Sequence, residues 1–266
     1  MSESASDILK TALVQARLQW QDPAANRDHL SGLMDRQPGC DLYLLPETFS
    51  TGFLGDRPDQ PETMDGVTVA WMQEQAHERS AAVAGSLAML DGQRRVNRFL
   101  FVTADGVLAH YDKRHLFGFG GEDERYQHGH SHTTIEWRGW RIDLQICYDL
   151  RFPVWCRNSR EFDLQIFVAN WPAPRVEAWC ALLKARAIEN QCYVIGVNRT
   201  GSDGNNIQYS GRTSAFDPMG ESLIAMGDEE NVAVIELNIN KLRDIREKFP
   251  FLRDADDFKL SLTPDP

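Results

Sequence analysis

Strongly apolar strands recur along the chain, and they constrain its fold more than any other feature. The run at 164–170, LQIFVAN, is almost fully apolar, and 41–47 (DLYLLPE) and 192–199 (CYVIGVNR) are compact apolar strands as well. A strand that is apolar on both sides is typical of a sheet covered on both faces. The sequence therefore predicts buried sheets that carry further layers of structure.

Helices are expected between these strands. The best helical pattern is at 176–191, and further helices are expected at 22–36, 66–80 and 241–249. Asp22 is a suitable N-cap for the first of them, with Pro23 at its first position. Strands at 81–90, 96–104 and 107–113 are separated by Asp-Gly turns, which predicts hairpins. Because no linker or repeat divides the chain, we expect one mixed α/β domain over residues 1–266.

Composition narrows the partners that the protein can have. The chain has 28 Lys+Arg and 39 Asp+Glu, a net charge of −11, which argues against nucleic acid or an anionic membrane. No apolar run approaches the ~20 residues of a membrane helix, and the N-terminus lacks the apolar core of a signal peptide. The five cysteines are odd in number and form no C-x-x-C pair, which favours reduced thiols. We expect a cytoplasmic protein with a small-molecule partner.

The stretch 141–153, RIDLQICYDLRFP, places a thiol at the end of a strand. Ile142, Leu144 and Ile146 alternate with polar residues until Cys147, where the pattern stops. A sharp turn is expected next, followed by a helix with Pro153 in its first turn. Most lone buried cysteines are inert, but a thiol at this position can also be presented as a nucleophile.

Two more polar residues end strands in the same way. Glu47 ends 41–47 and Lys113 ends 107–113, and α/β sheets bind ligands at the carboxyl ends of their strands. A carboxylate near a thiol can accept its proton. An ammonium group, with the Tyr148 N–H as a second donor, can hold the oxyanion that forms when the thiolate attacks a carbonyl. Alone, Glu47 could be a loop charge and Lys113 a surface cation; together the three residues predict acyl transfer through a thioester.

The loop at 114–130 and the residues after it are rich in histidine. His115, His128, His130 and His132 raise the question of a metal site. Their spacing matches no zinc pattern with a helical or C-x-x-C partner. We therefore favour a solvated loop and expect no metal.

These residues also carry a family resemblance. Glu47 in LPETFSTGF, Lys113 in YDKRHLF and Cys147 in ICYDLRFP resemble the Glu-Lys-Cys triad of the nitrilase (carbon–nitrogen hydrolase) superfamily. The similarity covers nearly the whole chain, including 168–175 and 185–199, and is strongest to the small bacterial members of the omega-amidase branch. It implies a four-layer αββα sandwich, amide hydrolysis without a cofactor, and a homodimer or higher homo-oligomer.

The resemblance also implies a second glutamate in the loop between the lysine and the cysteine. Glu122 is the preferred match, as the carboxylate whose charge supports Lys113, and Glu124 is its rival. Either residue could instead be a solvated acid of the loop.

The substrates that the resemblance implies are ω-amides of small dicarboxylate monoamides, such as 2-oxoglutaramate and 2-oxosuccinamate. Their far carboxylate requires a cation, for which Arg175 is the candidate, although it could equally be a solvated arginine. Phe53, Tyr148 and Trp171 could form the pocket wall or belong to the core.

Other activities stay open at this point. A nitrilase, a carbamoylase or an aliphatic amidase would need only a different pocket. A non-catalytic dimeric scaffold is disfavoured because Glu47, Lys113 and Cys147 are all present.

Overall fold

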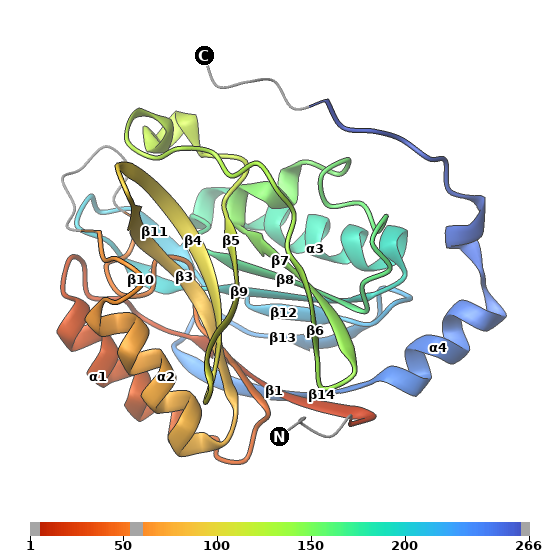
Figure 1. Cartoon of the computed structure of the whole chain (residues 1–266), viewed down its shortest axis with the longest axis horizontal. Helices are drawn as coiled ribbons and strands as arrows, with labels where there is room; N and C mark the ends of the chain where they lie inside the picture. The colour runs from red at the N-terminus through yellow and green to blue at the C-terminus, as the bar shows by residue number, and fades with distance from the viewer. Residues whose placement is uncertain (1–5, 54–60, 262–266) are drawn as a thin grey trace.

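The chain folds into four layers, with two β-sheets packed face to face and helices on their outer faces (Figure 1). This computed structural model describes residues 6–53 and 61–261. The arrangement confirms the expected four-layer αββα sandwich.

The first sheet has six strands in the order β14-β1-β2-β3-β4-β5. Strands β1, β2 and β3 are parallel, whereas β14, β4 and β5 pair antiparallel with their neighbours. The bounds are β1 Ile8–Gln15, β2 Leu42–Leu44, β3 Ala82–Asp91, β4 Arg94–Thr103, β5 Gly106–Asp112 and β14 Asn231–Asn238.

Helices α1 (Pro23–Met34) and α2 (Val67–Arg79) cover the outer face of this sheet. Leu30 and Met72 lie in one buried cluster with Tyr43 and Val83 of the sheet. As expected, Asp22 caps α1 by accepting a hydrogen bond from the backbone of Ala25.

The second sheet also has six strands, in the order β13-β12-β9-β8-β7-β6. Its central strands β7, β8 and β9 are parallel. The bounds are β6 Thr134–Trp137, β7 Trp140–Ile146, β8 Leu164–Ala169, β9 Tyr193–Asn198, β12 Ser214–Phe216 and β13 Ser222–Ala225.

Helix α3 (Val176–Asn190) packs closely on this second sheet. A side chain at Gly196 of β9 would meet Leu183 and Trp179 of α3 within 2.4–2.6 Å, so only glycine permits this approach. The structure also has a small pair of strands, β10 (Thr200–Ser202) and β11 (Gln208–Ser210), and helix α4 (Ile239–Lys248).

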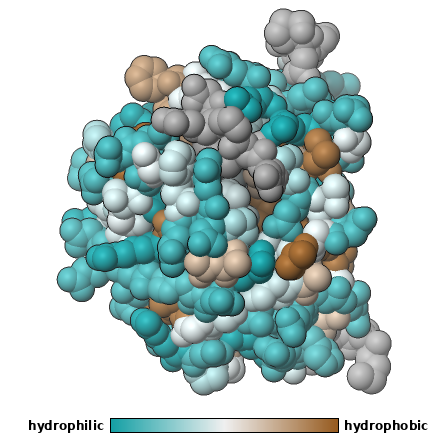
Figure 2. Space-filling view, turned by 90° about the vertical axis from the view of Figure 1, so that its left-hand side faces the viewer, coloured by the Kyte–Doolittle hydropathy of each residue, from teal (hydrophilic) through white to brown (hydrophobic). Residues whose placement is uncertain are grey.

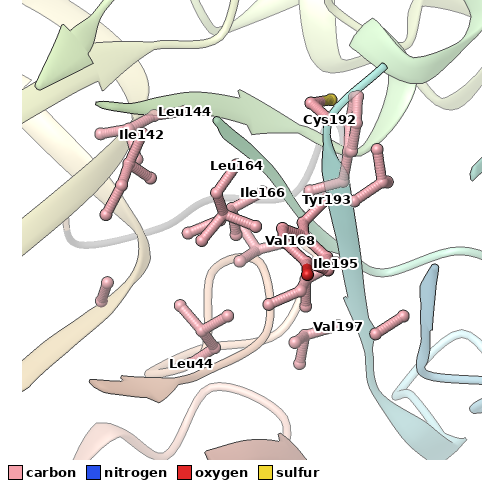
Figure 3. Close-up of a cluster of buried hydrophobic side chains, with 14 of the residues drawn as sticks. Leu44, Ile142, Leu144, Leu164, Ile166, Val168, Cys192, Tyr193, Ile195 and Val197 are labelled. Carbon is pink, nitrogen blue, oxygen red and sulfur yellow. The ribbon is translucent and has the colours of Figure 1, made fainter. Parts of the chain in front are cut away.

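The main core lies between the two sheets (Figure 3). Leu44 of β2 faces the apolar side chains that β8 and β9 present, including Val168 and Val197, and all three residues are fully buried. Each such side chain contributes roughly 1.5–3 kcal/mol relative to exposure in water. The apolar interface therefore fixes the two sheets relative to each other, and with them the loops at the ends of their strands.

The segment after Cys147 differs from the expectation. A 3-10 helix, η3 (Cys147–Arg151), follows β7 directly, and Pro153 lies in a turn instead of a longer helix. Phe152 separates the two with φ −110° and ψ 89°. A residue before proline disfavours the helical conformation, so the helix predicted after Cys147 was wrong.

The face of the molecule in Figure 2 is mostly hydrophilic, with apolar side chains scattered over it. Within residues 6–53 and 61–261, no helix combines the length and the apolar character that crossing a membrane requires.

Candidate active site

Glu47, Lys113 and Cys147 lie together, although they follow strands of different sheets. Lys113 comes directly after β5 and Glu47 three residues after β2 in the first sheet, and Cys147 directly follows β7 of the second. All three side chains are at least nine-tenths buried. The packing of sheet against sheet therefore assembles this cluster at one end of the sandwich.

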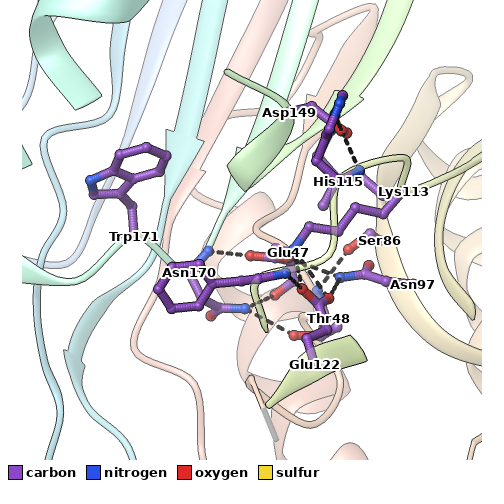
Figure 4. Close-up of polar contacts among 12 residues, drawn as sticks. Glu47, Thr48, Ser86, Asn97, Lys113, His115, Glu122, Asp149, Asn170 and Trp171 are labelled. Carbon is purple, nitrogen blue, oxygen red and sulfur yellow. Dashed lines mark hydrogen bonds and ion pairs between the residues drawn. The ribbon is translucent and has the colours of Figure 1, made fainter. Parts of the chain in front are cut away.

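Hydrogen bonds hold both oxygens of the Glu47 carboxylate (Figure 4). Oε1 accepts from Lys113 Nζ at 2.7 Å and from Asn97 Nδ2 at 2.9 Å. Oε2 accepts from the backbone N–H of Asn170 at 2.7 Å. The Asn170 side chain also donates to the Glu47 carbonyl oxygen, so the whole residue is fixed in place.

Lys113 lies between two buried carboxylates. Its Nζ donates to Glu47 and also to Glu122, at 2.8 and 3.1 Å from the two Glu122 oxygens. Burial lowers the pKa of this ammonium group, but the charges of Glu122 and Glu47 outweigh burial and raise the pKa well above its ordinary value. Lys113 is therefore a permanent cation. Glu122 is 1% exposed, whereas its rival Glu124 is on the surface.

Cys147 sits in a strained backbone conformation at the start of η3. Its φ is +43°, in the left-handed region that residues other than glycine rarely occupy. The thiol lies close enough to the Glu47 carboxylate to feel its charge. Burial, followed by the Glu47 charge, raises the pKa of the thiol well above its ordinary value, and Lys113 opposes this rise. The resting thiol is therefore protonated, and it requires a base to react.

A pocket of about 460 Å³ opens above these three residues. Phe53, Phe117 and Trp171 contribute aromatic walls. Among the described lining residues, Glu47 is the only acid, and the bases are Lys113, Arg151 and Arg175. Because Lys113 is already paired with two carboxylates, the two arginines give the pocket an excess of positive charge.

Each of these arginines is half-buried and stacked on an aromatic ring. The guanidinium of Arg151 lies 4.9 Å from the ring centre of Trp171, and that of Arg175 lies 5.1 Å from the ring centre of Phe117. Neither forms an ion pair with any residue that the structure describes. Trp171 is itself fixed, because its indole N–H donates to the Arg175 carbonyl oxygen at 2.7 Å.

The other residues expected near the pocket are present as well. The Phe53 ring centre lies 6.0 Å from Lys113 Nζ. The Tyr148 ring meets Phe117 edge-on at 5.1 Å, and Tyr148 also lines the pocket. These aromatic residues therefore contribute to the pocket wall.

Two of the histidines in the histidine-rich segment contact groups of the fold. In the described part of the chain, no cluster of three or more His, Cys, Asp or Glu side chains could hold a metal ion. His115 is hydrogen-bonded to Asp149 at 2.8 Å. Burial, reinforced by Arg160, lowers the pKa of His132 to about 4, and its neutral ring stacks on Trp155.

Sequence reasoning missed Asn97, Asn170 and Arg151. The Asn97 side chain donates to Glu47 at 2.9 Å and to Glu122 at 3.0 Å, and so bridges the two carboxylates. The available signal was a polar residue inside the apolar strand at 96–104. Asn170 and Arg151 lie next to residues that had been singled out, but nothing in the sequence showed where their side chains point.

Known proteins resemble this chain over almost all of its length. The family model for carbon–nitrogen hydrolases matches residues 10–247. The chain is 46% identical to the omega-amidase YafV of Escherichia coli (strain K12) over 254 residues, which are 95% of this chain and 98% of that protein. It is 32% identical over 220 residues to a 2-oxoglutaramate amidase of Bacillus subtilis (strain 168), covering 81% of this chain and 85% of that protein.

A solved structure agrees with this similarity. XC1258 from Xanthomonas campestris, described as a CN-hydrolase superfamily protein with an arsenic adduct in the active site, superposes with a TM-score of 0.93. It is 46% identical in sequence, and the match covers 96% of this chain and 99% of that one. By sequence and by fold, this chain belongs to the carbon–nitrogen hydrolase family.

Proposed function

We propose that this protein is a cysteine-dependent amidohydrolase that releases ammonia from the ω-amide of small dicarboxylate monoamides, such as 2-oxoglutaramate or 2-oxosuccinamate. The main support is one observation: Glu47 is hydrogen-bonded to Lys113 and lies beside the Cys147 thiol, at the base of a pocket with two arginines that form no ion pair with any described residue. The relatives named omega-amidase and 2-oxoglutaramate amidase support the substrate class.

Acylation begins with the proton of the Cys147 thiol. Glu47 takes this proton as the sulfur attacks the amide carbon, so the C–S bond forms without a free thiolate in the resting enzyme. Lys113 Nζ and the backbone N–H of Tyr148 hold the tetrahedral oxyanion. Glu47 then gives the proton to the amide nitrogen, the C–N bond breaks, and ammonia leaves a thioester on Cys147.

Deacylation uses the same base. Glu47 takes a proton from a water molecule, whose oxygen attacks the thioester, and the returning proton restores the thiol as the carboxylic acid leaves. Glu122 and Asn97 support both steps indirectly. They hold Lys113 and Glu47 in position, and the Glu122 charge keeps Lys113 protonated.

The two arginines account for a substrate with a far carboxylate. Arg175 and Arg151 are candidates to bind that group, because a guanidinium can donate two parallel hydrogen bonds to a carboxylate. Phe117 and Trp171 hold their side chains by stacking, which lowers the entropy lost on binding. Trp171 and Phe53 would then enclose the short chain between the two ends of the substrate.

Ammonia release from a small set of substrates tests this function. The purified protein is given 2-oxoglutaramate, glutamine, a simple nitrile and an N-carbamoyl amino acid, with Cys147→Ser as the control. We expect 2-oxoglutaramate to give the highest kcat/KM, and the variant to lose nearly all of this activity. Turnover of the nitrile or the carbamoyl compound alone would replace the omega-amidase assignment by another activity of the family.

We further propose that residues 1–266 act as one catalytic domain, in the cytoplasm, as a homodimer. Both sheets contribute to the pocket, which supports a single unit. All five cysteines are free, which supports a reducing compartment. Exposed apolar residues such as Ile188 (48%) and Phe251 (58%) are candidates for the contact between subunits. Light scattering during gel filtration should give twice the chain mass, and a monomer would contradict the dimer.

A further inference from the structure

The nucleophile rests on a conformation that its own residue type disfavours. Cys147 has φ +43°, and a side chain at such a φ persists only where the surrounding structure holds it. Cys147 is followed by only a short 3-10 helix, so hydrogen bonds within η3 give little restraint. Side-chain contacts, beyond the backbone hydrogen bonds of η3, must therefore fix the direction in which its sulfur points.

Asp149 is the group that holds this turn. Its carboxylate is fully buried and accepts four hydrogen bonds. Oδ2 accepts from the backbone N–H of Ile146 at 3.1 Å, immediately before Cys147, and from the Tyr111 hydroxyl at 2.8 Å. Oδ1 accepts from the backbone N–H of His115 at 2.9 Å and from its ring Nδ1 at 2.8 Å (Figure 4).

Three of these four donors come from the segment that carries Lys113. Tyr111 and His115 lie two residues before and two residues after the lysine. The Tyr111 hydroxyl also accepts from the backbone N–H of Arg114 at 3.1 Å. The His115 ring stacks on Phe152 with ring centres 3.7 Å apart, which ties the same segment to the residue after η3. Asp149 therefore joins the two sheets where they supply the nucleophile and the cation.

We propose that Asp149, assisted by His115, is a positioning residue for the reaction. This inference rests on the proposed role of Cys147 as the nucleophile. The carboxylate acts through the backbone: it holds Ile146 and the left-handed Cys147 so that the thiol faces Glu47, and it holds the Lys113 segment at a fixed distance from the same turn. A sulfur displaced by about 1 Å can cost on the order of 10²-fold in rate.

Asp149→Asn is the variant that tests this inference. The amide is the same size, but its nitrogen cannot accept hydrogen bonds. In one orientation the Ile146 N–H faces this nitrogen, and in the other the His115 N–H does. Asp143→Asn is the matched control: Asp143 is equally buried, lies on β7 just before η3, and accepts from Gln145, Gln165 and Arg160 without contacting the site.

Four quantities are measured for wild type and each variant: kcat, KM, the melting temperature, and the rate at which iodoacetamide alkylates Cys147, followed on its peptide by mass spectrometry. We expect Asp149→Asn to lower kcat on the order of 10²-fold with KM within about threefold. Alkylation should slow by more than about tenfold, because Glu47 no longer meets the thiol. Asp143→Asn should keep both rates within about threefold of wild type, although its melting temperature falls comparably.

Equal rates in the two variants would overturn the inference, as would a loss of kcat that matches the unfolded fraction. If Asp149→Asn does not fold, His115→Ala tests the inference instead. This variant removes the ring N–H that donates to Asp149 and leaves the Asp149 carboxylate intact. It should lower kcat by about tenfold at unchanged KM, and an unchanged kcat would contradict the proposal. Amide hydrolysis by Cys147→Ser at the rate of wild type would refute the proposed function itself, whatever the Asp149 variants do.

Discussion

The charged groups at the two ends of the pocket differ in burial and in pairing. The floor consists of Glu47, Lys113 and Cys147, and the outer wall carries Arg151 and Arg175. On the floor, Lys113 and Glu47 are fully buried and paired, with Glu122 behind them. On the outer wall, Arg151 and Arg175 are half-buried and stacked on rings, with no acidic partner in the described part of the chain. A fully buried charge requires a partner of opposite charge, whereas a half-buried guanidinium is solvated by water and stays available to bind a ligand. We therefore expect the floor to determine the rate of the reaction and the outer wall to determine which substrate binds.

Among the residues of the floor, we expect the largest loss of activity from replacing the nucleophile, Cys147. Cys147→Ser should lower kcat by about 10³-fold or more on every amide, because a hydroxyl is a much weaker nucleophile in the same place. The measurement is ammonia release at saturating substrate. A loss confined to dicarboxylate monoamides would contradict the division between floor and wall.

Because Lys113 is buried between two carboxylates, its removal should strongly reduce the stability of the fold. Lys113→Met leaves Glu47 and Glu122 side by side without a cation, and should reduce the free energy of unfolding by about 3–5 kcal/mol. Arg141→Met is the control, because the ion pair of Arg141 with Glu161 is at the surface, with side chains 39% and 87% exposed. It should cost less than about 1 kcal/mol. Urea denaturation measures both, and similar losses would show that burial of the floor is unimportant.

The outer wall should respond to the charge of the substrate. Arg175→Ala and Arg151→Ala should each raise KM for 2-oxoglutaramate by roughly 10- to 100-fold, the value of a charged hydrogen bond of about 1.5–3 kcal/mol. The KM of a neutral aliphatic amide should change by less than about threefold. Arg253→Ala, at an exposed arginine, is the control. An arginine whose loss affects both substrates equally does not bind the carboxylate.

We expect the smallest effect on activity from a substitution of Glu124, and this substitution distinguishes Glu124 from Glu122. Glu124 is exposed, so Glu124→Gln should leave kcat and KM within about twofold of wild type. Glu122→Gln should lower kcat, because Lys113 loses one of its two carboxylate partners. A tenfold loss in the Glu124 variant would make that residue the supporting acid instead.

Reasoning from the residues predicted buried sheets and placed Glu47, Lys113 and Cys147 together at strand ends, whereas the four-layer arrangement was implied by the family resemblance. The reasoning from residues succeeded because apolar strands indicate burial, and strand ends indicate where polar residues gather. Asn97 and Asp149 were beyond its reach, since their roles depend on contacts between segments far apart in the chain. Asp149 contacts Tyr111, 38 residues away, and Asn97 contacts Glu47, 50 residues away.

The preference of proline for the first turn of a helix led to one wrong prediction. Pro153 suits the first turn of a helix, but the same proline disfavours helical geometry at Phe152, and the structure has a short 3-10 helix followed by a turn. Arg175 was singled out by substrate chemistry alone. Its stacking on Phe117, and the second arginine at position 151, follow from the packing of loops that the sequence does not specify.

The acyl-enzyme is the most direct test of the central claim, that Cys147 carries the acyl group. Wild-type protein is mixed rapidly with 2-oxoglutaramate, quenched in acid within the first turnover, digested and weighed by mass spectrometry. The account predicts the added mass of the acyl group on the Cys147 peptide, with one ammonia released for each adduct. Ammonia released with Cys147 unmodified at every time point, or the adduct on another cysteine, would contradict it.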